Sequence, residues 1–388
     1  MLLRGARQLL TLRGDPCVRR GPQSSNLEVI EDGSVFIQGG KIVAVGPTRR
    51  LENLKETRGA IEIPAHQCVV MPGFVDASMQ LSLLTPQGLN GTPRRRRKLR
   101  DFFNESLTLM RSCMLHGTLN AAIRARSGIH SMGADLSVLR QLARIGNNPV
   151  GLTRIWCPEC DLEHPIHEDH WPGGKAWQAA WDTIAKGKLA DCVSLHCENP
   201  FIQLDNQRSM KVILDWLGGS ADDLNRLLHQ SAPSGVFCQH DLSAEECDVL
   251  AASKTTAVFG AGAGLIDGSP DRSVRNLIDG GGAVALGSGY DSLDEQNFNM
   301  QLVLALAVRR LNLTIEEAIV ATTINAAYAM NCGHEIGSLE PGKRADLLIL
   351  SLNDYREIPR RLGINHLAMA IRGGEITANR TKWKVGAA

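Results

Sequence analysis

The segment Trp156–His170 gathers the densest set of potential metal ligands in the chain. Cys157 and Cys160 have the Cys-x-x-Cys spacing with which a turn presents two thiolates to one ion, and His164 is the first of three histidines that follow. Thiolate and imidazole are the ligands that Zn²⁺ prefers. The step from the second cysteine to the first histidine is much shorter than in zinc-finger modules. A zinc site and a polar loop with two buried thiols therefore both stay open.

Single polar side chains also stand at the ends of apolar runs. Glu198 and Asp241 follow two such runs and could work as acid and base, although carboxylates at strand ends also serve solubility. His196 ends the first of these runs and could contact a substrate. Ser78 could act as a nucleophile with His240 as its base. No Gly-x-Ser-x-Gly turn surrounds Ser78, so a space-filling serine is the competing interpretation.

The elements that must position these groups are short apolar runs alternating with longer helical patterns. Near-continuous apolar strands between helices are typical of a parallel sheet covered on both faces. Seven or eight such units predict an α/β fold, a (β/α)₈ TIM-type barrel over residues 66–339. The strand-rich ends, residues 1–65 and 340–388, are expected to pair into one small accessory β-domain. The clearest predicted strands are Val69–Asp76, Asn120–Ile123, Gly151–Trp156, Cys192–Leu195, Val236–Cys238, Thr256–Phe259 and Ala283–Leu286.

Two local patterns are specific enough to define elements. Residues 34–45 predict a β-hairpin that turns at Gly39–Gly40. Thr314 followed by Glu317 is a capping box, which predicts a helix from Thr314 to Asn331.

Four stretches together resemble the amidohydrolase superfamily, most closely its imidazolonepropionase-type members. Gly33–Gly46 is similar to the family's N-terminal hairpin, and Met71–Gln80 is similar to its Pro-Gly-Phe-Val-Asp barrel strand. Asn325–Met330 is similar to its Asn-x-Ala helix, and Gly337–Ile349 is similar to its return into the β-domain.

The resemblance implies metal-assisted hydrolysis of a C–N or C–O bond at the carboxyl ends of the barrel strands. The family's ligands are a His-x-His pair, two further histidines and an aspartate. Here Ser78 and Gln80 stand at the His-x-His positions and Gly289 at the aspartate position, with Asp291 two residues further on. Hydroxyl and amide oxygens are poor zinc ligands. His240 alone fits a family position, that of strand six.

The fifth strand of the barrel has two candidate positions in the sequence. One is Leu214–Asp215, and the other is the neighbourhood of His229. His229 lies within a helical pattern of leucines, which favours a histidine on a helix surface.

Two functions of different classes follow. The first is a relative that has lost catalysis and serves as a binding or subunit scaffold. The second is a hydrolase of a small cyclic amide or imide that uses a relocated metal or a metal-free acid–base site. We expect no cofactor at the usual site, with zinc at Cys157, Cys160 and His164 as the alternative. The catalytic candidates are His240, Asp291, Glu198 and Ser78, and the substrate-binding candidates are Gln80, Asp241 and His196.

Composition limits the partners and the compartment. The 388 residues carry 42 Lys and Arg against 41 Asp and Glu, a balance that argues against nucleic acid or an acidic membrane as the partner. No apolar run is long enough to cross a bilayer. Ten cysteines are too few for a disulfide scaffold and fit a cytoplasmic protein. We expect a small-molecule ligand at the barrel mouth, and a homo-oligomer stays open. The basic run Arg94–Arg97 is expected to form either a solvated loop or a lid that binds an anion.

Overall fold

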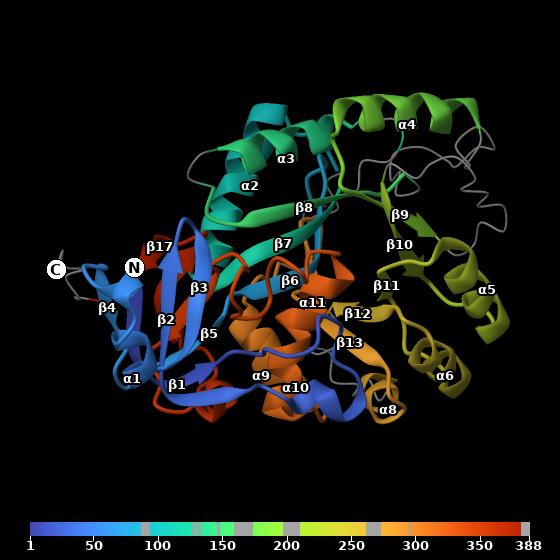
Figure 1. Ribbon diagram of the computed structural model, residues 1–388. Helices are drawn as coiled ribbons and strands as arrows, with labels where there is room; N and C mark the ends of the chain where they lie inside the picture. Colours follow the sequence, from blue (N-terminus) through green and yellow to red (C-terminus); the bar gives the residue numbers. More distant parts are fainter. Residues whose placement is uncertain are drawn as a thin grey trace.

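The chain folds into two sheets, a mixed sheet built from its two ends and a parallel sheet curled into a barrel (Figure 1). The computed structural model describes residues 1–86, 94–125, 129, 133–145, 148–158, 174–196, 210–260, 273–294 and 296–381. The α/β barrel with an accessory sheet confirms the fold that the sequence predicts.

The accessory sheet interleaves strands from both ends of the chain. The predicted hairpin is present as β2 and β3, and the segment before it adds β1 to the centre of the sheet. In spatial order the strands are β17 (Glu375–Asn379), β16 (Leu367–Arg372), β15 (Leu347–Leu350), β5 (Val69–Pro72), β1 (Leu2–Leu10), β2 (Val29–Gln38) and β3 (Lys41–Pro47), with β4 (Glu62–Pro64) paired to β1.

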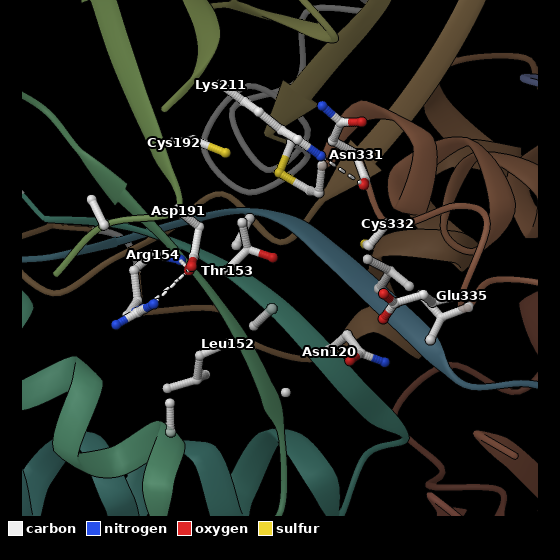
Figure 2. A pocket seen from close by; sticks show the side chains of 18 of the residues that line it. Asn120, Leu152, Thr153, Arg154, Asp191, Cys192, Lys211, Asn331, Cys332 and Glu335 are labelled. Atoms are coloured by element: carbon white, nitrogen blue, oxygen red, sulfur yellow. Dashed lines mark hydrogen bonds and ion pairs between the residues drawn. The ribbon is translucent and has the colours of Figure 1, made fainter. Parts of the chain in front are cut away.

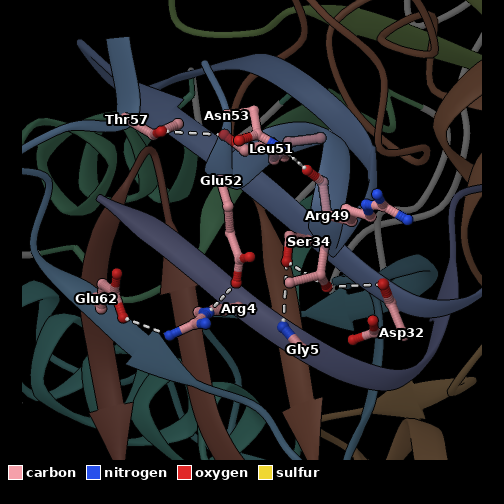
Figure 3. A network of polar contacts seen from close by, with 11 residues as sticks. Arg4, Gly5, Asp32, Ser34, Arg49, Leu51, Glu52, Asn53, Thr57 and Glu62 are labelled. Atoms are coloured by element: carbon pink, nitrogen blue, oxygen red, sulfur yellow. Dashed lines mark hydrogen bonds and ion pairs between the residues drawn. The ribbon is translucent and has the colours of Figure 1, made fainter. Parts of the chain in front are cut away.

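A polar network ties the short helix α1 (Thr48–Glu52) to this sheet (Figure 3). Arg4 of β1 pairs with Glu52 at the end of α1 and lies 3.4 Å from Glu62 of β4. The hydroxyl of Ser34 accepts the backbone N–H of Gly5 at 3.1 Å, at an irregularity in the β1–β2 pairing.

Every pair of consecutive barrel strands from β6 to β13 is parallel, and a two-residue strand, β14, pairs with β6. Lys211–Trp216 supplies the fifth strand, so the Leu214–Asp215 candidate is right and His229 lies on the exposed side of a helix, as its pattern favoured. The strands are β6 (Phe74–Leu81), β7 (Thr118–Ala125), β8 (Gly151–Trp156), β9 (Cys192–His196), β10 (Lys211–Trp216), β11 (Gly235–Cys238), β12 (Thr256–Gly260), β13 (Ala283–Gly287) and β14 (Tyr290–Asp291).

Helices cover the outside of the barrel and close its floor, the end where the strands begin (Figure 1). Helix α11 packs against β6, β11, β12 and β13. None of the described helices has the length and apolar character that a bilayer span needs. The helices are α2 (Leu99–Met114), α3 (Ala134–Arg144), α4 (Lys175–Gly187), α5 (Ala221–Ser231), α6 (Ala244–Ala252), α8 (Ser273–Asp279), α9 (Met300–Arg310), α10 (Ile315–Ala321) and α11 (Ile324–Ala329), with 3₁₀ turns at Gly21–Ser25, Lys55–Thr57 and Tyr355–Arg360.

One apolar cluster fills the barrel interior with a side chain from each of the eight principal strands, which makes the interior a packed core and not a pore. Alanines of α11 complete the cluster from the floor. The strand residues are Val75, Ala122, Ile155, Cys192, Ile213, Phe237, Val258 and Ala285.

The predicted strand Val69–Asp76 divides at Gly73. Residues Val69–Pro72 form β5 and pair with β1 and β15, whereas Phe74 begins the barrel strand β6. A Cβ on Gly73 would lie 2.5 Å from the Leu119 side chain, so this crossing needs glycine. The barrel therefore begins at residue 74 and not at residue 66, since a single sequence run serves both sheets.

The predicted helix Thr314–Asn331 begins with its capping box but breaks into α10 and α11. The hydroxyls of Thr322 and Thr323 donate back to the carbonyls of Ala318 and Ile319, and the carbonyl of Thr322 accepts the N–H of Val75. The break lets α10 and α11 take different directions while one of them contacts the barrel strand β6.

Candidate functional site

The carboxyl ends of the strands form the mouth of the barrel, where the family's chemistry is expected. Ser78 lies there at the seam between β6 and β13. Its N–H donates to Oδ1 of Asp76 at 3.1 Å, and its carbonyl accepts the N–H of Gly289 at 3.0 Å. Oδ1 of Asp76 also accepts the N–H of Ser288 at 2.8 Å. Asp76 thus holds the first and last principal strands together and closes the barrel.

Glycines surround Ser78 on this seam. A Cβ on Gly287 would lie 2.3 Å from Ser78 N, and one on Gly260 would lie 3.4 Å from Ser78 Oγ and 3.1 Å from the Cα of Gly289. Ser78 is 6% exposed. The backbones of β6 and β13 therefore approach each other closely at Ser78, and position 287 needs glycine.

The expected aspartate position, Gly289, has a φ of +69°, a conformation that aspartate adopts only with strain. Asp291 lies beyond it on β14, opposite Gln80 of β6. Oδ1 of Asp291 accepts the N–H of Leu293 at 2.9 Å, so the carboxylate stabilises the turn that follows β14. Gln80 and Asp291 are neighbours in the β6–β14 register, and their roles stay a prediction.

A buried ion pair crosses the interior between β7 and β10. Arg124 pairs with Oδ2 of Asp215, the Ser194 hydroxyl of β9 donates to the same oxygen at 2.7 Å, and the guanidinium carbon lies 4.6 Å from the centre of the Phe237 ring. Arg124 is 2% exposed and Asp215 is fully buried. Four strands therefore contribute to one charged cluster inside the barrel.

The sequence predicts a strand over Asn120–Ile123 that ends before Arg124, so it does not predict this cluster. A signal was available, because arginine within an apolar strand is rarely buried without a partner. What the sequence could not supply was the identity of that partner, since Arg124 and Asp215 are 91 residues apart.

His240 follows β11, and its contacts point toward β10 and α6. Its Nε2 lies 3.4 Å from Oε1 of Glu246, and its ring centre lies 6.5 Å from that of Trp216. Glu246 is itself held by the indole N–H of Trp216 at 2.5 Å and by the N–H of Ser243 at 2.7 Å. Among the described residues no hydrogen bond or ion pair joins His240 to Ser78, so the nucleophile–base pair stays a prediction.

The structure describes only some of the remaining candidate residues. Asp241 is exposed beside His240, and Cys157 is fully buried in the interior cluster. His196 is the last residue of β9, opposite Asp215 in the strand register, and only its backbone is described. Glu198, Cys160 and His164 lie outside the described residues.

Asp76 is the carboxyl group at the mouth with the most unusual environment. It is fully buried, and burial raises its pKa from 3.8 to about 6, while the N–H donors of Ser288 and Ser78 oppose that rise. Its Oδ2 is buried without a hydrogen-bond partner. A carboxyl placed this way is partly protonated near neutral pH.

The basic run after β6 is anchored at the rim. The N–H of Arg97 donates to the carbonyl of Leu83 at 2.7 Å, and the N–H of Thr85 donates to the carbonyl of Arg95 at 2.9 Å. The Arg97 side chain pairs with Glu105 of α2 at 2.8 Å, beside a cavity of about 440 Å³ that also touches Tyr290. The run is thus fixed beside the mouth, while its role as a lid stays a prediction.

The residues at the mouth do not fit the divalent metal that the resemblance implies. Ser78 and Gln80 offer neutral oxygens, Gly289 offers no side chain, and Arg124 brings a permanent positive charge to the strand beside Gln80. Within the part of the chain that the structure describes, no three His, Cys, Asp or Glu side chains come together so as to hold a metal ion.

Comparisons with known proteins agree with this fold. The model of the amidohydrolase family matches residues 268–378. The imidazolonepropionase of Chloroflexus aggregans is 29% identical, with 97% of this chain and 98% of the relative covered. That of Geobacillus thermodenitrificans is 28% identical, with 98% and 99% covered.

Solved structures show the same architecture at lower identity. Escherichia coli guanine deaminase matches with a TM-score of 0.64 at 16% identity, covering 98% of this chain and all of that one. A Xaa-Pro dipeptidase with methionine bound in its active site matches with a TM-score of 0.70 at 14% identity, covering 97% and 98%. At these identities the likeness shows the fold alone.

Proposed function

Since the chain belongs to the amidohydrolase superfamily and is imidazolonepropionase-like, we propose that it retains the barrel without the usual metal centre. In this proposal the chain does not hydrolyse C–N bonds by the metal route and serves as a binding or subunit scaffold. The proposal covers the mouth of the barrel only, and it leaves the binding of small molecules elsewhere open.

The observation that carries the proposal is the Arg124–Asp215 pair. A guanidinium keeps its charge at every pH at which a protein folds, so it cannot make way for a metal by losing a proton. Arg124 and Asp215 are buried together, and Asp215 is an interior carboxylate that could otherwise face a cation. The charge that a metal would bring is therefore already supplied by the chain itself.

The backbone at the seam supports the same conclusion. A ligating aspartate at position 289 would need a backbone with positive φ, and glycines of β12 and β13 lie close to position 78. The missing ligands thus coincide with a closely approaching backbone at the seam. A site that had merely exchanged its ligands would keep the room for an ion.

The test measures metal content and turnover on the same preparation. The full chain is produced in medium containing zinc, manganese, iron and nickel salts, and its metal content is measured by plasma mass spectrometry. Turnover is measured with imidazolonepropionate, the compound that the relatives' name denotes. The Geobacillus thermodenitrificans relative is prepared in parallel and must show both metal and activity.

We expect metal far below one ion per chain and no turnover above the buffer rate. One tightly held ion with turnover that a chelator abolishes would overturn the proposal and favour a hydrolase with a relocated metal. Turnover without metal would also overturn it, in favour of a metal-free acid–base site.

A further inference from the structure

A second cavity opens at the floor of the barrel, opposite the mouth (Figure 2). Its volume is about 770 Å³, within the range of small-molecule sites. The first residues of β7, β8, β9 and β10 line one side, the end of α11 lines another, and Arg344 and Arg372 reach it from the accessory domain. The cavity therefore lies between the two sheets of the molecule.

Two of the five cations that line this cavity are neutralised by carboxylates. Arg154 of β8 pairs with Asp191, with contacts of 2.7 and 3.0 Å from Nη2 and Nε (Figure 2). Arg344 pairs with both oxygens of Asp346, including a 3.0 Å contact from Nε. These two arginines therefore add little net charge to the cavity.

The other three cations have no such partner among the described residues. Arg372 donates from Nη1 to the backbone carbonyl of Asn148 at 3.2 Å, and its Nε is buried with no hydrogen-bond partner. Burial lowers the pKa of Arg372, and the nearby charge of Asp346 offsets part of that shift. Lys211 donates to the carbonyl of Asn331 at 3.4 Å, and Lys188 lies exposed at the rim.

The one remaining carboxylate of the lining is Glu335, at the rim (Figure 2). Its side chain is 62% exposed and lies 3.6 Å from His334. Solvent screens an exposed carboxylate strongly, so Glu335 offsets only part of the excess positive charge.

We propose that this floor cavity binds a small organic polyanion, a compound with two or more carboxylate or phosphate groups. Arg372 supplies a guanidinium that forms no ion pair with a carboxylate among the described residues, and the exposed Lys211 and Lys188 supply two further charges that solvent screens in part. The bound anion would join the barrel to the accessory domain, because these side chains come from both. The inference is independent of whether the mouth of the barrel is catalytic.

The test uses the full chain with citrate and pyrophosphate as probes. Binding is measured by calorimetry, and the thermal midpoint is followed with sodium chloride as the control at equal ionic strength. The variants are Arg372→Gln and Lys211→Gln. Lys254→Gln is the matched control, because Lys254 is exposed on a turn away from the cavity.

We expect binding by the wild type and by Lys254→Gln, and about tenfold weaker binding by each cavity variant, the loss that removal of one charge-assisted hydrogen bond gives. Because Arg372→Gln also removes the contact with Asn148, Lys211→Gln is the cleaner variant. A midpoint that rises no further than in sodium chloride would overturn the proposal. Equal affinity in wild type and Lys211→Gln would overturn it as well. Binding of one probe alone identifies carboxylate or phosphate as the preferred group.

Discussion

Two arginine–aspartate pairs lie in different parts of the barrel and differ mainly in their access to water. Arg124 and Asp215 are 2% and 0% exposed inside the barrel, whereas Arg154 and Asp191 at the floor are 14% and 41% exposed. The buried pair has its aspartate held further by Ser194. The floor pair is bidentate and stands beside cations that have no carboxylate partner.

The contrast shows that burial determines how much an ion pair contributes to the packing and stability of the barrel. Inside the barrel, both charges were removed from water, so each is held in place by the other. At the floor, Asp191 is exposed to water, which weakens the attraction between the two charges. The interior pair therefore determines the packing of the barrel, and the floor pair leaves its surroundings free to bind a ligand.

Removal of one partner of the interior pair should have the largest effect. Asp215→Ala leaves the Arg124 guanidinium buried without its carboxylate, and we expect a loss of about 3–5 kcal/mol in the free energy of unfolding. Urea titration followed by tryptophan fluorescence measures this loss.

A matched control separates the charge from the packing. The double variant Arg124→Met with Asp215→Leu removes both charges while it keeps apolar volume, and it should recover most of the stability of the wild type. A loss of less than about 1 kcal/mol in Asp215→Ala, the value for exposed pairs, would show that water reaches the interior.

Rebuilding the family's metal ligands should have the next largest effect. We expect Ser78→His with Gln80→His and Gly289→Asp to bind no zinc in equilibrium dialysis. The histidine overpacks the seam at a cost of about 1–3 kcal/mol. The aspartate at positive φ adds a strain of about 1–3 kcal/mol.

The double variant Ser78→His with Gln80→His keeps Gly289 and isolates that strain. Zinc binding by the triple variant with an unchanged urea midpoint would contradict the scaffold proposal, since it would show that the mouth had kept its room for an ion.

Asp76 gives the β6–β13 seam a pH dependence. Its pKa in the folded chain, about 6, lies above its ordinary 3.8, so the folded state binds the proton more tightly than the unfolded state. The folded chain therefore loses stability as pH rises through this interval, by about 1–3 kcal/mol from this group.

Asp76→Asn should remove that loss, because the amide keeps an acceptor for Ser78 and Ser288 but does not ionise. The measurement is the urea midpoint of both proteins on either side of the interval from 3.8 to about 6. Parallel pH profiles for the two proteins would exclude this role of Asp76.

The sequence predicts what depends on local pattern and misses what depends on distant partners. The capping box at Thr314 and the hairpin at Gly39–Gly40 are local, and both are present. The break at Thr322 depends on a contact with Val75, nearly 250 residues earlier, and the sequence alone does not show it.

In the candidate site, too, local motifs were predictable and contacts between distant residues were not. The resemblance assigns Ser78, Gln80, Gly289 and His240 to equivalent family positions. The β6–β13 seam brings the first three near one another. His240 instead contacts Glu246 and Trp216. The ion pair of Arg124 was not predictable, because a strand pattern fixes which face a side chain takes but not which strand lies across the barrel.

We expect the smallest loss of stability when the floor pair, Arg154 and Asp191, is broken. Asp191→Asn leaves Arg154 without its carboxylate, as Asp215→Ala does for Arg124. The floor pair is partly exposed, however, and Arg154 keeps the carbonyl of Lys188 and the new amide oxygen as acceptors. We expect a loss of only about 0.2–1 kcal/mol, and a smaller one at high salt, which screens exposed charges. The variant should also make the floor more positive and bind pyrophosphate more tightly. Urea titration at low and high salt, with calorimetry, measures both quantities. A loss as large as that of Asp215→Ala would show that burial does not distinguish the two pairs.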